Sequence, residues 1–205
     1  MTRPAGLWAL AVTASNRAAA GIYEDRGGPL VVAALEELGF AVDGPRIVPD
    51  GAPVEQALRE AVAEGYDVVI TTGGTGISPT DRTPDVTRGL LDYEVPGIAE
   101  AIRAAGREKV PTAVLSRGVA GVSGRTLVVN LPGSTGGVKD GLAVLAPLVV
   151  HAVDQIRGGD HPNNRPYDNA ASRAHGDPGQ PHHPTRDRSD DRPNDHPNSV
   201  TGRPS

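Results

Sequence analysis

Two aspartates and one glycine-rich loop carry the residue types in this chain that could act on phosphate groups. The loop runs from Thr72 to Gly76, and Asp81 follows it, while Asp50 lies further back. Glycines let backbone amides approach a bound group, and free amides at a helix start favour an anion. A carboxylate repels a phosphate unless a cation lies between them, and Mg²⁺ is the usual cation. These residues therefore predict a site that joins phosphate to carboxylate through Mg²⁺.

The glycine loop is not specific by itself, because glycines also form ordinary tight turns. It is not a P-loop, since no Gly-Lys-Ser or Gly-Lys-Thr follows it and Lys109 and Lys139 are the only lysines. Its glycine spacing also differs from the dinucleotide fingerprint. Asp50 could instead serve the helix start ahead of Pro53, and Asp81 could cap the helix that follows it. The residues alone leave the structural and the functional interpretations open.

Apolar periodicity predicts the elements that would position these residues. Strands are expected at 7–12, 40–48 and 67–72, and helices between them at 30–38 and 53–64. Strand, helix, strand, helix, strand with short links is typical of a parallel sheet covered on both faces. The expected fold class is α/β, a three-layer, doubly wound and mostly parallel sheet.

The second half of the folded region is expected to contain further helices and a hairpin. Thr83 is expected as the N-cap of a helix from Pro84 to Leu91, with Pro84 at its first position. Two apolar runs flank Ser123-Gly124-Arg125 and predict the hairpin. The remaining helices are expected at 97–107, around 138–145 and at 148–156.

The candidate site residues fall where strands are expected to end. Ligands of open parallel sheets bind outside the carboxyl ends of the strands. The residues expected at these ends are Ser15, Asp50, Thr72, Gly73, Gly74, Thr75, Gly76, Asp81, Pro132, Gly133 and Ser134. Ser15 and Ser134 could also be ordinary turn residues.

Composition excludes several classes of protein. The formal net charge is −5, so a nucleic-acid partner is not expected. The chain has no cysteine, which excludes disulfides, thiol catalysis and cysteine-bound metals and is consistent with a cytoplasmic protein. No apolar run is long enough to predict a membrane span.

Composition also divides the chain. Residues 158–205 consist mainly of Pro, Asp, Asn, Arg, His, Gly and Ser, with Tyr167 and Val200 as the only large apolar residues. Such a segment buries too little apolar surface to offset its ordering entropy. One folded domain is therefore expected at 1–157, followed by a disordered tail at 158–205.

Several motifs in order resemble the MogA/MoaB family of molybdenum-cofactor biosynthesis proteins, which is also related to the gephyrin G domain. The resemblance covers nearly all of Leu7 to Arg157 and leaves out the tail. The matching blocks are Val12–Ser15 with Gly21, Asp25 and Gly28; Val48–Asp50; Thr71–Gly76 with Asp81, Thr83 and Pro84; Glu94–Gly97; Leu115–Arg117; and Asn130–Ser134.

The resemblance implies adenylylation of molybdopterin, in which Mg-ATP donates AMP to the pterin's terminal phosphate and pyrophosphate leaves. It implies that Asp50 and Asp81 are the functional acids and that they bind Mg²⁺. Thr72 to Gly76 would cradle phosphate through backbone amides. Ser116 and Pro132 to Ser134 would hold the pterin end. The implied assembly is a homotrimer, or in some members a hexamer.

A second function stays open beside the enzyme. A paralogue that holds molybdopterin or an assembly partner without turnover would share the same motifs. Retention of Asp50 and Asp81 favours the enzyme. The order Thr80-Asp81-Arg82-Thr83 favours the alternative, because family members often carry the arginine before the aspartate.

Overall fold

A six-stranded mixed sheet forms the centre of the computed structural model, which describes residues 6–159. The sheet order is β2-β1-β3-β6-β5-β4. Four strands run parallel: β1 (Leu7–Ala14), β2 (Phe40–Val48), β3 (Val68–Thr72) and β6 (Thr126–Leu131). Strand β5 (Ala120–Ser123) forms the expected hairpin with β6, and β4 (Tyr93–Glu94) pairs antiparallel to β5.

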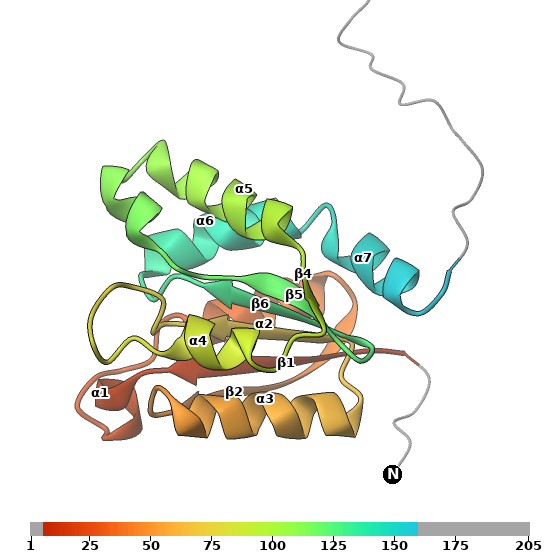
Figure 1. Cartoon of the computed structure of the whole chain (residues 1–205), viewed down its shortest axis with the longest axis horizontal. Helices are drawn as coiled ribbons and strands as arrows, with labels where there is room; N and C mark the ends of the chain where they lie inside the picture. The colour runs from red at the N-terminus through yellow and green to blue at the C-terminus, as the bar shows by residue number, and fades with distance from the viewer. Residues whose placement is uncertain (1–5, 160–205) are drawn as a thin grey trace, which may run out of the picture. The chain divides into compact units, whose positions relative to one another are not determined.

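Helices cover both faces of this sheet (Figure 1). One face carries α2 (Gly28–Glu37), α5 (Pro96–Arg107), α6 (Thr135–Leu145) and α7 (Val149–Ile156). The other face carries α3 (Ala52–Glu64) and α4 (Thr83–Arg88). A short helix, α1 (Asn16–Ala19), follows β1, and a 3₁₀ helix, η1 (Pro111–Leu115), follows α5.

The apolar core lies in two layers because successive strand residues point to opposite faces. In β1, Ala9 and Ala11 belong to the core under α2, α5, α6 and α7, whereas Leu10 and Val12 belong to the core over α3. All of β3 is buried. Burial on both faces explains why this strand reads as a continuous apolar run rather than an alternating one. The three-layer, mostly parallel α/β fold expected from the sequence is confirmed.

The structure corrects several expected element boundaries. Thr83 is the first residue of α4 rather than its N-cap, since Arg82 occupies the cap position without a side-chain cap bond. The Thr83 hydroxyl instead donates to Asp50 Oδ1 at 2.9 Å. Helix α4 also ends at Arg88, before the expected Leu91. The strand β4 and the helix α1 were not expected, because two and four residues are too short to show a period.

The expected tail lies outside the described residues from residue 160 onward. Among residues 6–159, no single helix has the length and apolar character needed to cross a membrane. Helices α6 and α7 meet that test only as a pair, bent by 58°.

Candidate functional site

Two adjoining cavities lie where the parallel strands end. The first, called here the α1 cavity, has a volume of about 710 Å³ and extends from the β3–α4 loop toward α1. The second, called here the α5 cavity, has a volume of about 560 Å³ and extends from the same loop toward α5, η1 and α6. Both are lined by Gly74, Asp81, Gly133 and Ser134, so the glycine loop stands where they meet.

Every candidate residue named from the sequence lines one of these cavities or both. The α1 cavity holds Ser15, Asp50, Thr72, Gly73 and the four shared residues. The α5 cavity holds Thr75, Gly76, Ser116, Pro132 and the same four. The parallel sheet brings these distant segments together because strand ends that lie far apart in sequence meet at one edge.

Asp50 is held by hydrogen bonds that also build the start of α4. Its Oδ1 accepts from the Gly51 amide at 2.7 Å, and its Oδ2 accepts from the Arg82 amide at 3.1 Å. Gly74 has a φ of +62°, and a Cβ there would stand 2.0 Å from Asp50 Oδ2. Only glycine fits at this position, because a side chain would displace the carboxylate. Asp50 therefore serves a helix start, that of α4, and lies in the cavity as well.

Asp81 lies against the glycine loop from the other side. Its Oδ2 accepts from the Ser78 amide at 2.9 Å, and a Cβ at Gly76 would lie 2.8 Å from that oxygen. The alternative in which Asp81 caps α4 is wrong, because the Arg82 amide at the helix start donates to Asp50 instead. Both carboxylates thus approach a short glycine segment, one at Gly74 and one at Gly76.

Arg117 ties both ends of the Asp81 loop together. Its Nε donates to the Gly76 carbonyl at 2.8 Å, and its Nη2 donates to the Asp81 carbonyl. Its Nη1 donates to Asp85 Oδ1 at 2.9 Å, which fastens the same guanidinium to α4. The carbonyl contacts were not foreseen.

The ion pair between Arg117 and Asp85 shifts the pKa of both groups. Hydrogen bonds from Arg117 hold the pKa of Asp85 below its ordinary value, with a further contribution from the charges of Arg117, Arg82 and Arg88. The hydrogen bond to Asp85 raises the pKa of Arg117 in turn. Asp85 is therefore ionised at neutral pH. The ion pair that holds Arg117 against the Asp81 loop is fully charged at that pH.

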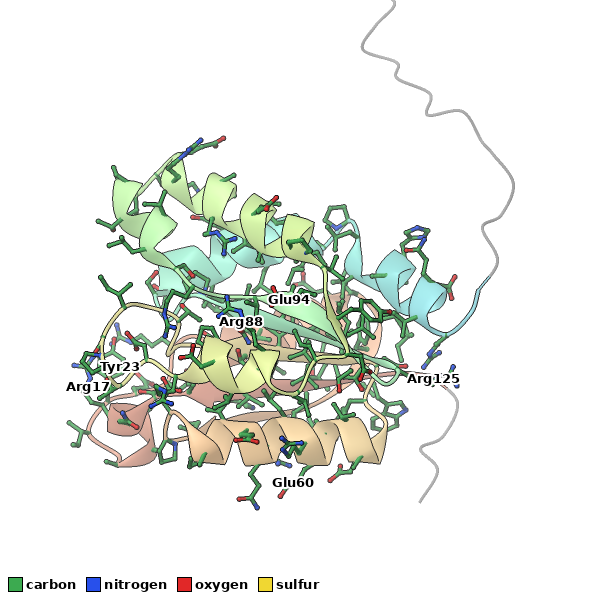
Figure 2. All side chains as sticks on the ribbon, viewed as in Figure 1. Arg17, Tyr23, Glu60, Arg88, Glu94 and Arg125 are labelled. Atoms are coloured by element: carbon green, nitrogen blue, oxygen red, sulfur yellow. The ribbon has the colours of Figure 1, made fainter. Side chains whose placement is uncertain are left out.

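Two arginines line the α1 cavity and were missed in the sequence. Arg17 and Arg26 are the cations among its described lining residues. The Arg17 guanidinium lies over the Tyr23 ring, 5.2 Å from its centroid, and Figure 2 shows the two side chains together. Because they lie in the α1 and α1–α2 segments, only the fold places them beside Asp50. They supply positive charge that would suit a polyphosphate.

The α5 cavity differs in character because much of its wall is apolar. Its apolar lining residues are Ile77, Ile102, Val110, Ala113 and Leu115. Its charged lining residues besides Asp81 are Arg103, Lys109 and Asp140. Lys109 and Asp140 form an ion pair between residues 31 positions apart, and no sequence spacing could have indicated it.

The donor set at the glycine loop fits Mg²⁺ completed by substrate. No group of three or more His, Cys, Asp or Glu residues that could hold a metal occurs between residues 6 and 159. Mg²⁺ usually binds through one or two carboxylates, with phosphates and waters completing its shell. Asp50 and Asp81 both line the α1 cavity and both lie against glycines. This pair matches that requirement.

Comparison with known proteins gives one family. Residues 10–151 match the family model described as a probable molybdopterin binding domain. Molybdopterin adenylyltransferase of Haemophilus influenzae is 44% identical over 136 residues, which cover 64% of this chain and 68% of that protein. The molybdenum cofactor biosynthesis bifunctional protein of Synechococcus elongatus is 39% identical over 158 residues, which cover 77% of this chain and 50% of that protein. The chain thus spans about half the length of such bifunctional relatives.

Solved structures agree with the family comparison. The molybdopterin biosynthesis Mog protein of Mycobacterium ulcerans is 54% identical with a TM-score of 0.72, and the match covers 76% of this chain and 99% of that one. The tungsten cofactor synthesizing protein MoaB of Pyrococcus furiosus is 37% identical with a TM-score of 0.69, covering 76% and 99%. The resemblance drawn from the ordered motifs is confirmed.

Proposed function

The chain belongs to the family of probable molybdopterin-binding domains, and on that premise we propose that it is a molybdopterin adenylyltransferase of molybdenum cofactor biosynthesis. Its substrates are molybdopterin and ATP. An oxygen of the pterin's terminal phosphate attacks the α-phosphorus of ATP, and the bond from that phosphorus to the bridging oxygen breaks. The products are adenylyl-molybdopterin and pyrophosphate.

The observation that carries this proposal is the junction of the two cavities. Two large substrates that exchange a phosphoryl-linked group must each have a cavity, and the cavities must meet at the reacting atoms. The α1 and α5 cavities share Gly74, Asp81, Gly133 and Ser134. The more polar α1 cavity, with Arg17 and Arg26, suits the nucleotide. The α5 cavity, with its apolar wall and Ser116, suits the pterin.

The chain's own residues position the phosphates. The backbone amides of Gly74 to Gly76 would face the phosphate, since the Gly73 amide already donates to the Leu131 carbonyl at 3.2 Å. Ser134 caps α6 beside them, with its hydroxyl accepting from the Gly137 amide at 3.1 Å. Asp50 and Asp81 would hold Mg²⁺, which when bound neutralises phosphate charge. Attack of one phosphate on another depends on position and charge more than on a general base.

The resemblance supplies the assembly, and the lack of cysteine supports the location; we include both in the proposal. The expected protein is a cytoplasmic homotrimer, with a hexamer as the other assembly found in the family. Sedimentation velocity of the purified full chain would show a trimer or hexamer, and a monomer would contradict this part.

The experiment that tests the function is a turnover assay with molybdopterin, ATP and Mg²⁺ under anaerobic conditions. We expect adenylyl-molybdopterin and pyrophosphate to form in equal amounts, and neither to form without Mg²⁺. The alternative is a protein that holds molybdopterin without turnover. Tight binding of molybdopterin with no product would establish that alternative and overturn the enzyme.

A further inference from the structure

A carboxylate and an ammonium lie together in the wall of the α5 cavity, away from the glycine loop. Asp140 belongs to α6, and Lys109 follows α5. Lys109 Nζ donates to Asp140 Oδ1. The Asp140 side chain is only 12% exposed, whereas that of Lys109 is 69% exposed. Neither residue belongs to the motifs that define the family resemblance.

Apolar side chains and glycines surround this pair in the cavity. Ile102, Val110 and Ala113 contribute apolar wall. On α6, the cavity is lined by Gly136 and Gly137, so no side chain fills this part of the helix surface. A Cβ at Gly136 would meet no atom within 4 Å, so space is open there. A planar heterocycle can therefore lie against α6 and reach Asp140.

The hydrogen-bonding pattern of the pair matches one edge of a pterin. The pyrimidine edge of a pterin presents a 2-amino group, an N3–H group and a 4-oxo group, which are two donors and one acceptor. A carboxylate accepts two hydrogen bonds side by side, and an ammonium donates. A carboxylate beside an ammonium is thus complementary to this edge, and the carboxylate has lone pairs enough to keep its bond to Lys109.

We propose that Asp140 and Lys109 recognise the pyrimidine edge of the pterin. Asp140 accepts from the 2-amino and N3–H groups, and Lys109 donates to the 4-oxo group. This inference rests on the proposed function, since it takes the α5 cavity as the pterin cavity. The two residues thereby determine which heterocycle the enzyme accepts.

The length of α6 is consistent with this orientation. The pterin's phosphate must lie near Ser134, where the two cavities meet. Asp140 lies six positions after Ser134, which is a rise of about 9 Å along a helix. A pyranopterin with one phosphate-bearing side chain can span this distance. The reacting phosphate and the recognised edge thus occupy opposite ends of one ligand.

The test compares two stable probes in fluorescence titrations of the full chain. One probe is 6-hydroxymethylpterin phosphate, and the other is the matching lumazine, which carries a 2-oxo group in place of the 2-amino group. Wild type is expected to bind the pterin on the order of tenfold more tightly, the difference that one charge-assisted hydrogen bond makes. Asp140→Asn should lose most of this preference and keep its affinity for ATP.

The chain offers a matched control for the cation. Lys109→Met should weaken pterin binding, whereas Lys139→Met should not, because Lys139 is exposed on α6 and does not line the cavity. An ion pair that only joined α5 to α6 would change thermal stability and leave the preference between probes intact.

Each outcome separates this inference from the function beneath it. A wild-type preference that Asp140→Asn retains would overturn the inference and leave the adenylyltransferase standing. Failure of wild type to bind the pterin probe would overturn this inference, whereas the adenylyltransferase is tested separately by turnover with molybdopterin. Guanine carries the same edge, so GMP is added as a competitor. If GMP displaced the probe with equal affinity, Asp140 and Lys109 would be assigned to guanine recognition, which would contradict the pterin assignment.

Discussion

Arg117 holds the Asp81 loop by hydrogen bonds from its side chain and its backbone. Its guanidinium donates to the carbonyls of Gly76 and Asp81, and its backbone amide donates to the Thr75 carbonyl at 2.7 Å. Asp85 holds the guanidinium in place from α4. The position of Asp81 thus depends on a charged pair whose strength changes with pH.

We predict that Asp85→Asn lowers the free energy of unfolding by about 1 kcal/mol near neutral pH, as for a well-aligned surface ion pair. The pKa of Asp85 is depressed in the folded state by Arg117. The pair therefore stabilises the protein fully above the unfolded pKa of about 4, and this contribution is lost as pH falls through the folded value. Urea unfolding at a series of pH values should show the difference in free energy of unfolding between Asp85→Asn and wild type becoming smaller in acid.

A difference in free energy that stays constant down to acid pH would contradict the ion-pair account. Asp154→Asn, on the exposed side of α7, is the control.

The sequence indicated which residues belong to the site more reliably than it indicated their hydrogen-bond partners. The aspartates and glycines stood out because their chemistry and spacing are local. Arg117 did not, because its acceptors lie 36 and 41 residues away. Lys109, in the turn after α5, meets Asp140 of α6 only because α5 packs beside α6, and such a contact leaves no pattern within either segment.

At the scale of elements, the β3–α4 connection depends on two glycines. Any other residue at these positions would have a strained backbone and a side chain that clashes with its neighbours. Gly73 has a φ of +94°, and a Cβ there would stand 2.3 Å from the Ala14 carbonyl oxygen. Gly74 has a φ of +62° and lies against Asp50 and Thr83. Two successive glycines therefore let β3 end beside β1 and let the Asp50 carboxylate reach the start of α4.

We predict that Gly74→Ala destabilises the protein by about 2–4 kcal/mol, combining left-handed backbone strain with a forced shift of Asp50. Turnover should also fall, because the shifted carboxylate is one of the proposed Mg²⁺ ligands. Thermal unfolding and the adenylylation assay would measure the two effects. Gly97→Ala is the matched control, since a Cβ there meets no atom within 4 Å and alanine favours a helix. Equal stability of the two variants would show that this loop is not strained.

The elements themselves were largely predictable from the sequence. The strands at 7–12 and 67–72 and the hairpin were found because buried strands contain continuous apolar runs, whereas the strand at 40–48, which is mostly not buried, showed only a weak alternation. The error at Thr83 has a tertiary cause. Its hydroxyl donates to Asp50, 33 residues earlier, so a local capping rule could not place it.

For the described domain as a whole, the two ends of residues 6–159 are joined at the sheet edge opposite the site. Asp67 lies just before β3, and its carboxylate accepts from the Trp8 amide at 2.8 Å and from Arg157 Nε at 2.8 Å. Arg157 also donates to the Gly6 carbonyl at 2.7 Å. These bonds fasten the segment after α7 to the start of β1.

We predict that Arg157→Ala lowers the free energy of unfolding by about 1–3 kcal/mol, because Asp67 loses charge-assisted hydrogen bonds in a largely buried position. The Asp67 side chain is 9% exposed. Turnover per folded molecule should remain unchanged, since β3 carries Asp67 and the glycine loop at opposite ends. Denaturant unfolding would measure the loss. Arg125→Ala is the control, because Arg125 lies exposed at the hairpin turn (Figure 2). Equal effects of the two substitutions would contradict a role for Arg157 in closing the domain.

The most direct test of the account is turnover by Asp81→Asn, measured together with molybdopterin binding. Asparagine keeps the size of the side chain and an acceptor for the Ser78 amide, so only the charge at the junction of the cavities is removed. We expect adenylylation to fall roughly a hundredfold or more, as when a preorganised charge is lost from a reacting centre, while molybdopterin still binds. Turnover within a few-fold of wild type would show that the two substrates do not react at Asp81 and would contradict the proposed site.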